Sequence, residues 1–359
     1  MIRIEINNCL GTLKPGFSTY SGAALKKIFN SHKVSHILPF QSTDEEGPQH
    51  EKFIDNRTHF SIAGVQEKLS LRLERNKLRL TREGETGQYL LKPIPRDIKK
   101  VSQVPANEHL TTQIAKQVYD IATAECCLIF FDNGKPAFLS RRFDVRPDGT
   151  KFLQEDFASI AGKTNENSGD DFKYDYDYLA LGQLIRKNVN AADIEIEKYF
   201  KRVVFNYLFS NGDAHLKNFS LLESATGDYV LSPAYDLLCT RIHVPETSDF
   251  ALKGGLSPTA KSKRSFQTLG YYGYDDFYDF GIELGIKPLR VKRIMDLMTT
   301  DHSLVHELIS NSYLNAEIKP EYLSLYKQRL EKISNSVRDN TLKEALALMQ
   351  MNSTNIAAE

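Results

Sequence analysis

Two short polar segments in the second half of the chain place two carboxylates and one amide in a fixed order. In the segment NGDAHLKNF, Asp213 is followed five residues later by Asn218, and Asp236 comes eighteen residues further on, within SPAYDLL. Phosphoryl transfer needs a proton acceptor and oxygen ligands for magnesium, all held rigidly around one phosphate. The spacing therefore predicts a rigid loop after a buried helix, and the apolar run Tyr199–Phe209 is the candidate helix.

Each of these residues also has a plainer interpretation. Gly212 and Asp213 form a common turn pair, and Asp236 is a plausible cap. Their order favours Asp213 as a catalytic base that takes the proton of an attacking hydroxyl, with Asn218 and Asp236 as magnesium ligands. A metallophosphohydrolase site built from Asp213, His215 and Asp236 is the competing interpretation. It would need further paired His or Asp residues, and the sequence shows no such spacing.

The first half of the chain has the alternating pattern of β-strands. Leucines alternate with polar residues from Leu69 to Leu80, which predicts a hairpin, and Tyr89–Lys92 predicts a strand before a proline. Apolar residues at helical spacing predict a helix over Asn107–Tyr119. Two apolar runs between Cys126 and Leu139, separated by Asp-Asn-Gly, predict a second hairpin.

After Arg141 the pattern becomes mostly helical, and Asp170–Tyr178 has the acidic, aromatic character of a surface loop. The chain is thus expected to be an α+β protein with a two-lobed, protein-kinase-like fold. We expect a lead-in over 1–58, a β-rich nucleotide-binding lobe over 59–142 and a helical catalytic lobe over 143–359. A length of 359 residues is sufficient for two such lobes.

The first lobe contains residues suited to hold a nucleotide. The segment 61–68 (SIAGVQEK) leads into a strand and could cover phosphates with its backbone N–H groups. Lys92 is placed to reach the α- and β-phosphates, with Glu108 as its partner. Two alternatives remain open. The segment 61–68 would then be only the start of a strand, and Glu108 would be a carboxylate near a helix N-terminus that complements the helix dipole. Arg142 and Phe143 lie where the lobes join, at the expected adenine site.

Composition argues against some classes of partner. Lys plus Arg equals Asp plus Glu at 46 each, so direct, strong nucleic-acid binding is not expected. The longest apolar run, Cys126–Phe131, is far shorter than the roughly 20 residues that span a bilayer. The N-terminal residues lack the apolar core of a signal peptide. The four cysteines have no metal-ligand spacing, which favours reduced thiols in a cytoplasmic protein.

With these residues in place, the chain resembles the HipA family of bacterial serine/threonine kinase toxins. The matching segments, in family order, are Ser61–Leu73, Tyr89–Pro93, Asn107–His109, Arg141–Asp144, Gln154–Ala158, Asn211–Phe219 and Ser232–Leu238. The resemblance implies a HipA-like fold, Asp213 as base, Asn218 and Asp236 as Mg²⁺ ligands, and autophosphorylation at Ser61. The residues that it implies around ATP are Lys92, Ser61, Ile62, Ala63, Gly64, Lys68, Arg142, Phe143, His215 and Lys217.

The chain departs from full-length HipA-family members at its N-terminus, because only 60 residues precede the loop that begins at Ser61. In this it is similar to the short HipT toxins of tripartite HipBST systems. That similarity implies two partners, a HipS-like small antitoxin and a HipB-like helix-turn-helix antitoxin that binds DNA. It also implies an aminoacyl-tRNA synthetase as substrate, with the tryptophanyl enzyme favoured.

The sequence therefore predicts an ATP- and magnesium-dependent protein serine/threonine kinase whose action arrests growth. A small-molecule kinase of the aminoglycoside or choline type is the rival enzyme, because it shares the Asp, Asn and later Asp pattern. The loop at Ser61 and the reduced N-terminus argue against that rival. A catalytically silent module that only binds a DNA-binding antitoxin is the other alternative, although every catalytic position is filled.

Overall fold

The computed structural model describes residues 5–42, 67–95, 98–245 and 248–339. Its β-rich lobe is a five-stranded antiparallel sheet in the order β2-β1-β3-β5-β4. These strands are β1 (Leu69–Glu74), β2 (Lys77–Leu80), β3 (Tyr89–Lys92), β4 (Cys126–Phe130) and β5 (Pro136–Arg141). Both predicted hairpins and the strand before the proline are therefore confirmed.

Residues from the predicted lead-in pack into this lobe. The helix α1 (Gly22–Phe29) is capped at its N-terminus by Ser21, whose side chain accepts from the Ala24 amide. The phenol of Tyr20 donates to the Leu128 carbonyl at 2.9 Å, and Leu10 accepts from the Leu128 amide at 2.9 Å. Residues 5–42 therefore share the core of the sheet instead of forming a separate unit, and residues 43–58 lie outside the described residues.

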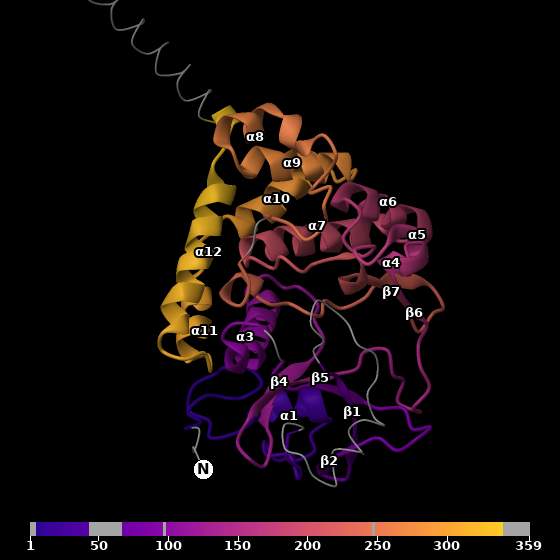
Figure 1. The fold of residues 1–359 in the computed structure, drawn as a ribbon, viewed down its shortest axis with the longest axis vertical. Coiled ribbons are helices and arrows are strands. Elements are labelled where there is room, and N and C mark those ends of the chain that lie inside the picture. Colours follow the sequence, from indigo (N-terminus) through magenta and orange to yellow (C-terminus); the bar gives the residue numbers. More distant parts are fainter. Residues whose placement is uncertain (1–4, 43–66, 96–97, 246–247, 340–359) are drawn as a thin grey trace, which may run out of the picture.

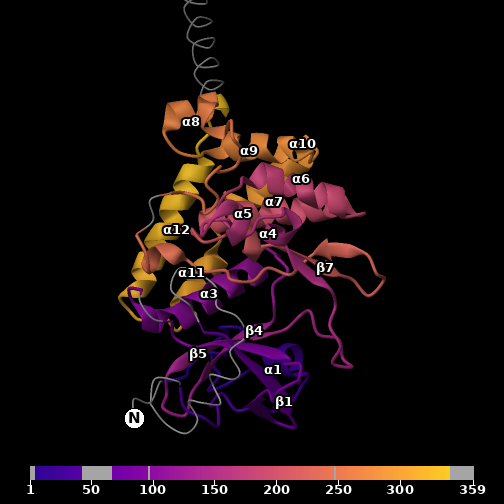
Figure 2. The same cartoon turned by 45° about the vertical axis from the view of Figure 1, so that its right-hand side comes forward.

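Helix α3 (Val104–Gln117), after the short helix η1 (Val101–Gln103), connects the two lobes. It packs on β4 and β5 on one side and on α11 on the other, and Figures 1 and 2 both show it between the sheet and the helical lobe. The side chain of Asn107 donates to the Cys239 carbonyl at 2.9 Å. Polar residues on α3 are buried for this reason, although an isolated amphipathic helix would expose them.

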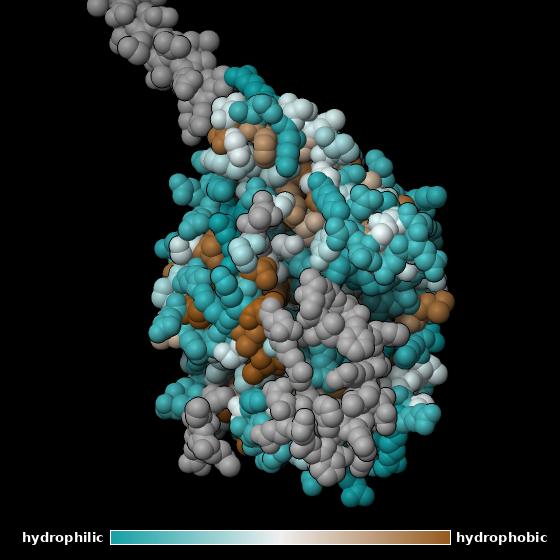
Figure 3. All heavy atoms as spheres, in the orientation of Figure 1, coloured by the Kyte–Doolittle hydropathy of each residue, from teal (hydrophilic) through white to brown (hydrophobic). Residues whose placement is uncertain are grey.

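The second lobe is mostly helical and contains a three-stranded sheet in the order β6-β7-β8. Those strands are β6 (Gln154–Asp156), β7 (Ser220–Glu223) and β8 (Tyr229–Leu231). The helices are α4 (Phe157–Ile160), α5 (Asn165–Ser168), α6 (Tyr178–Asn188), α7 (Ala192–Leu208), η2 (Leu216–Asn218), η3 (Thr240–Ile242), η4 (Ala260–Ser262), α8 (Arg264–Leu269), α9 (Tyr274–Glu283), α10 (Pro288–Met298), α11 (Ser303–Asn311) and α12 (Ile318–Ser334). On the face drawn in Figure 3 the described helical surface is largely hydrophilic.

The buried helix α7 begins seven residues earlier than the apolar run indicated, at Ala192 and not at Tyr199. Its first turn contains Asp193 and Glu195, which suit the positive end of the helix dipole. Because these residues are charged, the apolar run that predicted the helix does not include this turn. Tyr199, Phe200 and later apolar residues of α7 are fully buried. This rigid helix leads directly to the predicted catalytic loop. No helix of the described residues is long and apolar enough to span a membrane.

Candidate active site

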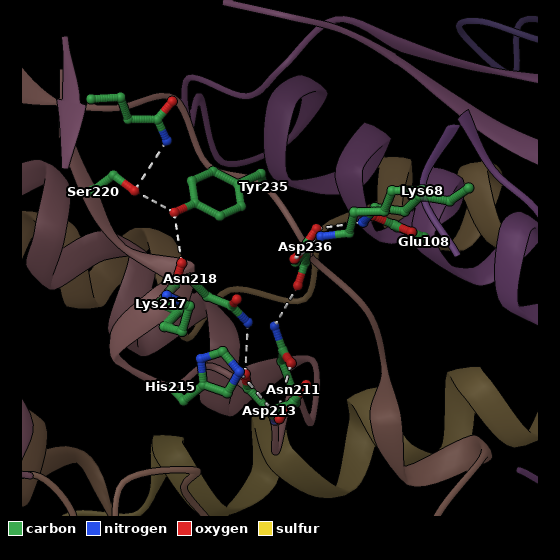
Figure 4. Close-up of polar contacts among 12 residues, drawn as sticks. Lys68, Glu108, Asn211, Asp213, His215, Lys217, Asn218, Ser220, Tyr235 and Asp236 are labelled. Atoms are coloured by element: carbon green, nitrogen blue, oxygen red, sulfur yellow. Dashed lines mark hydrogen bonds and ion pairs between the residues drawn. The ribbon is translucent and has the colours of Figure 1, made fainter. Parts of the chain in front are cut away.

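The loop after α7 is fixed by its own hydrogen bonds. Ser210 adopts a left-handed conformation (φ 49°) that ends the helix, and the Asn211 amide returns to the Asn206 carbonyl at 2.8 Å. The Asn218 side chain donates through Nδ2 to the Asp213 carbonyl at 2.7 Å. Asp213 and Asn218 therefore belong to one closed loop, as their spacing predicts, and Figure 4 shows both on the same side of the site.

A buried ion cluster connects the two lobes. Lys92 on β3 donates through Nζ to Glu108 Oε1 on α3 at 2.5 Å and also to Asp236 Oδ1. Lys68, just before β1, lies 3.6 Å from Asp236 Oδ2. The side chain of Asn211 donates to the Asp236 carbonyl at 3.2 Å, so the cluster is joined to the loop that contains Asp213 (Figure 4).

Burial and opposite charge compete within this cluster. Burial alone would lower the pKa of Lys92, but the carboxylates of Asp236 and Glu108 raise it above the ordinary value. Burial alone would raise the pKa of Asp236, but Lys68 and Lys92 lower it well below the usual range. The pKa of Glu108 is raised, because its burial outweighs the attraction of Lys92. Asp236 is thus an ionised carboxylate at neutral pH.

Asp213 has a different environment. The phenol of Tyr174 donates to its Oδ1 at 2.7 Å, and the imidazole Nε2 of His215 lies 3.8 Å from the same oxygen. Burial raises the pKa of Asp213, against the opposing effects of the Tyr174 hydrogen bond and of Lys173. Burial also lowers the pKa of His215 to about 3, so its imidazole is neutral. A carboxylate with a raised pKa, beside neutral donors, suits a proton acceptor.

A cavity of about 590 Å³ opens between the lobes, within the range of roughly 300–1,000 Å³ typical of ligand sites. Lys68, Lys92, Glu108 and Asp236 line one part of it. The predicted adenine residues Arg142 and Phe143 line it as well, together with Tyr235, whose ring centroid is 6.0 Å from that of Phe143. Arg142 is fixed by Asp144, which accepts from its Nε at 2.9 Å. Lys217 lines the cavity and donates to Asp156 at 2.7 Å.

Residues 60–304, more than half of the sequence, match the family described as the HipA-like C-terminal domain. The chain belongs to this family. It is similar to HipA of Shewanella oneidensis, solved as a complex of HipA, HipB and operator DNA, with a TM-score of 0.54 and 20% identity. The match covers 80% of this chain and 65% of that one. The likeness shows the fold, and the predicted two-lobed HipA-like α+β architecture is confirmed.

Curated relatives of this HipA-family chain carry kinase names. One from Sinorhizobium fredii, "Putative kinase Y4dM", is 34% identical over 216 residues, which cover 55% of this chain and 50% of that protein. One from Haemophilus influenzae, "Putative kinase", is 26% identical over 345 residues, covering 90% of this chain and 97% of that protein. The chain therefore spans about half the length of the first relative and nearly all of the second.

Four of the predicted nucleotide residues, Ser61, Ile62, Ala63 and Gly64, lie outside the described residues. Lys68, at the end of the same segment, is described and points to the Asp236 carboxylate. His215 lies against the Tyr174 ring at 5.1 Å, and neither of its ring nitrogens has a hydrogen-bond partner among the described residues. The neutral imidazole of His215 lies beside Asp213, and its two ring nitrogens suit hydrogen bonds with a polar ligand.

Sequence reasoning missed the importance of Asp170–Tyr178, which it interpreted as a surface loop. In this segment Lys173 is buried, Tyr174 holds Asp213, and Tyr178 starts α6 after the N-cap Asp177. The pKa of Lys173 is lowered by burial, although the nearby Asp213 opposes this. The only local signal was a Lys-Tyr pair among acidic residues, and its relation to Asp213 appears only in three dimensions.

The described donors fit a magnesium ion. Asp236 supplies an ionised carboxylate, and it adopts a left-handed backbone conformation (φ 55°) of the kind found at functional sites. Asn218 uses its amide nitrogen within the loop, so its side-chain oxygen, an atom of the type that hard cations prefer, is not needed for that contact. No group of three or more His, Cys, Asp or Glu side chains in the described ranges is arranged to hold a metal ion by itself.

Proposed function

We propose that this chain is an ATP- and magnesium-dependent protein serine/threonine kinase. The observation that carries the proposal is that two aspartates at one inter-lobe site have pKa values shifted in opposite directions. Asp236, with its lowered pKa, stands in the ion cluster with Lys92, and Asp213, with its raised pKa, stands on the rigid loop. Environments that separate the pKa values of two carboxyl groups are typical of sites where each group has a different role.

The residues divide the work of phosphoryl transfer. Asp213 accepts the proton of the attacking hydroxyl. At the same time a bond forms between the hydroxyl oxygen and the γ-phosphorus of ATP, and the bond between that phosphorus and the β-γ bridging oxygen breaks. Tyr174 orients the Asp213 carboxylate through the 2.7 Å hydrogen bond. Lys92 binds phosphate oxygens, and Glu108 holds the Lys92 ammonium in position. Asp236 and Asn218 would hold magnesium, which would neutralise charge on the phosphates.

The finer parts of the proposal follow from the resemblance to HipA-family toxins. We expect autophosphorylation at Ser61, which would add close to two negative charges near the phosphate site and weaken nucleotide binding. We expect an aminoacyl-tRNA synthetase as the substrate, the tryptophanyl enzyme first, and a HipS-like antitoxin as partner. A HipB-like partner is supported by the solved complex of the Shewanella oneidensis HipA with HipB and operator DNA.

Intact mass after incubation with magnesium and ATP tests the activity. Wild-type protein, Ser61→Ala and Asp213→Asn would be compared after phosphatase treatment, so that each starts without phosphate. We expect wild type to gain phosphate and Asp213→Asn to gain none. Loss of the gain in Ser61→Ala would assign the modified serine.

Separate substrate assays divide the alternatives. Tryptophanyl-tRNA synthetase and an aminoglycoside would be offered to wild type and to Asp213→Asn. Transfer to the antibiotic but to no protein would make the chain a small-molecule kinase. No transfer to any acceptor, and no autophosphorylation, would leave only a binding role.

A further inference from the structure

A second cavity lies in the helical lobe. Its volume is about 240 Å³, and it is lined by residues of η3, of the segment 248–255, of η4, of α8 and of α12, and by Tyr272. Figure 1 shows α12 along one side of the helical lobe and α8 at one end of it. It shares no lining residue with the inter-lobe cavity. Five cations and one carboxylate, Asp249, line it; the cations are Arg241, Lys253, Lys261, Arg329 and Lys332.

The positive charge of this basic cavity is only partly neutralised. Arg329 is buried and pairs with Asp249, and Lys253 lies 3.0 Å from Asp171 near the surface. Lys332 lies over the ring of Tyr271 at 5.3 Å. Arg241 and Lys261 are exposed, and no described carboxylate lies within ion-pair distance of either side chain. Because the whole chain has zero net charge, this concentration of cations is a local feature.

The lining chemistry suits a small, compact dianion. Guanidinium and ammonium groups bind phosphate through charge-assisted hydrogen bonds. The cavity also has apolar walls, from Phe250 and Phe266, that suit the carbon stem of a modified side chain. A nucleic acid would instead require cations spread along an extended surface. The observations therefore favour a single phosphoryl group.

Two contacts connect the basic cavity to the candidate active site. Arg329 Nε donates to Ser210 Oγ at 3.3 Å, and Ser210 immediately precedes the loop that holds Asp213. On the other side, the Lys253 amide donates to the Tyr174 carbonyl at 2.9 Å, and the Tyr174 phenol donates to Asp213. Residues of the basic cavity therefore contact both Ser210, which precedes the Asp213 loop, and Tyr174, which donates to Asp213.

We propose that the basic cavity binds a phosphate dianion, either the phosphomonoester of a phosphorylated protein side chain or free phosphate, and that its occupancy adjusts Asp213 through Ser210 and Tyr174. The binding does not depend on the proposed kinase function, whereas the adjustment of Asp213 rests on it. Binding and rate are therefore measured separately.

The binding test is calorimetry with three probes: inorganic phosphate, a phosphoserine peptide and the same peptide without phosphate. The variant is Arg241→Glu with Lys261→Glu, two exposed residues whose reversal leaves the buried Arg329 intact. The matched control is Lys287→Glu with Arg293→Glu, an equal charge change at exposed residues beside and within α10. All titrations are run with a non-hydrolysable ATP analogue at saturation, which occupies phosphate sites in the inter-lobe cavity.

We expect the phosphopeptide to bind wild type and the control alike, and to bind the variant about tenfold or more weakly. A peptide that binds more tightly than inorganic phosphate identifies a phosphorylated protein as the source, whereas equal affinities identify free phosphate. Equal binding of the two peptides, or equal binding to variant and control, overturns the proposal. Lys261→Ala, measured in the same way, confirms that an effect does not arise from misfolding of the double variant.

The rate test compares phosphoryl transfer with and without the bound probe. We expect the probe to change the rate and the pH profile of wild type and of the control, and to leave those of the variant unchanged. If wild type transfers no phosphate at all, the proposed function fails while the calorimetry still decides the binding. If transfer occurs and the bound probe leaves it unchanged, the connection to Asp213 is wrong.

Discussion

Asp213 and Asp236 differ in what surrounds them, although both are carboxylates of the same site. Asp236 meets two lysines and has a lowered pKa, whereas Asp213 meets a phenol and a neutral imidazole and has a raised pKa. The first environment keeps a permanent charge, which suits a cation ligand. The second makes proton uptake easier, which suits a base. Similar side chains thus acquire different roles from their neighbours.

The two carboxylates also differ in what they contribute to the stability of the fold. The Lys92–Glu108–Asp236 cluster is buried and its two carboxylates share the Lys92 ammonium, so each member depends on the others. Asp213 is held mainly by one hydrogen bond from the neutral Tyr174 phenol, and the burial of its carboxylate destabilises the fold. Function and stability therefore agree at Asp236 and oppose each other at Asp213.

The largest expected effect is on phosphoryl transfer in Asp213→Asn. Loss of the base should lower the single-turnover rate by about 10²–10⁴-fold, with nucleotide affinity nearly unchanged. Asp236→Asn should also lose transfer, but in addition its nucleotide affinity should no longer depend on magnesium. Nucleotide titrations with and without magnesium separate the two variants. Retention of magnesium-dependent affinity in Asp236→Asn would contradict its role as a ligand.

A large effect on stability is expected from Lys92→Met. The substitution leaves two buried carboxylates without their shared cation, which should cost about 3–5 kcal/mol in the free energy of unfolding from urea titrations. Adding Glu108→Gln should recover part of the loss, because one of the two charges is removed. The control is Arg79→Met, at a partly exposed ion pair with Glu74 and Glu85, for which a smaller loss of about 1 kcal/mol or less is expected. Equal losses at both positions would show that burial of the cluster is unimportant.

A smaller effect is expected from Tyr174→Phe. Its hydrogen bond lowers the pKa of Asp213, so removing the hydroxyl should raise that pKa and move the limb of the rate profile on which the base ionises to higher pH. The loss of one hydrogen bond should lower the maximal rate by about three- to tenfold. Tyr176→Phe, two residues away in the same segment, serves as the control. An unshifted pH limb in Tyr174→Phe would remove Tyr174 from the mechanism.

Local patterns in the sequence were sufficient to predict the strands and the loop around the two aspartates. Alternation predicted the strand that follows Lys68, the short apolar run before Pro93 predicted the strand that carries Lys92, and the spacing of Asp213 and Asn218 predicted their shared loop. These features depend on residues close together in the chain, where backbone periodicity and turn chemistry decide the outcome. The pairing of Lys92 with Glu108 was predicted from the kinase pattern, and the structure places the two side chains 2.5 Å apart.

The parts that sequence did not predict depend on distant segments. Tyr174 lies 39 residues before Asp213, and nothing in its local pattern indicates that contact. Residues 5–42 join the β-rich core through contacts such as that of Tyr20 with Leu128. The basic cavity collects Arg241, Lys261 and Lys332 from three separate elements. In each case the chemistry exists only after folding, so tertiary packing had to supply it.

The smallest expected effect concerns the stability cost of Asp213 itself. Because its folded pKa is raised, the ionised carboxylate opposes folding at neutral pH, and the opposition disappears as the pH falls through that pKa. Asp213→Asn should therefore melt about 1–3 °C above wild type at pH 7, and this difference should shrink on acidification. Asp236→Asn should behave in the opposite way. Its folded pKa is lowered, so wild type holds an advantage above the ordinary pKa of an aspartate and loses it in acid. Thermal melts of the three proteins across this pH range decide the matter, and a destabilised Asp213→Asn at pH 7 would mean that the carboxylate supports the fold after all.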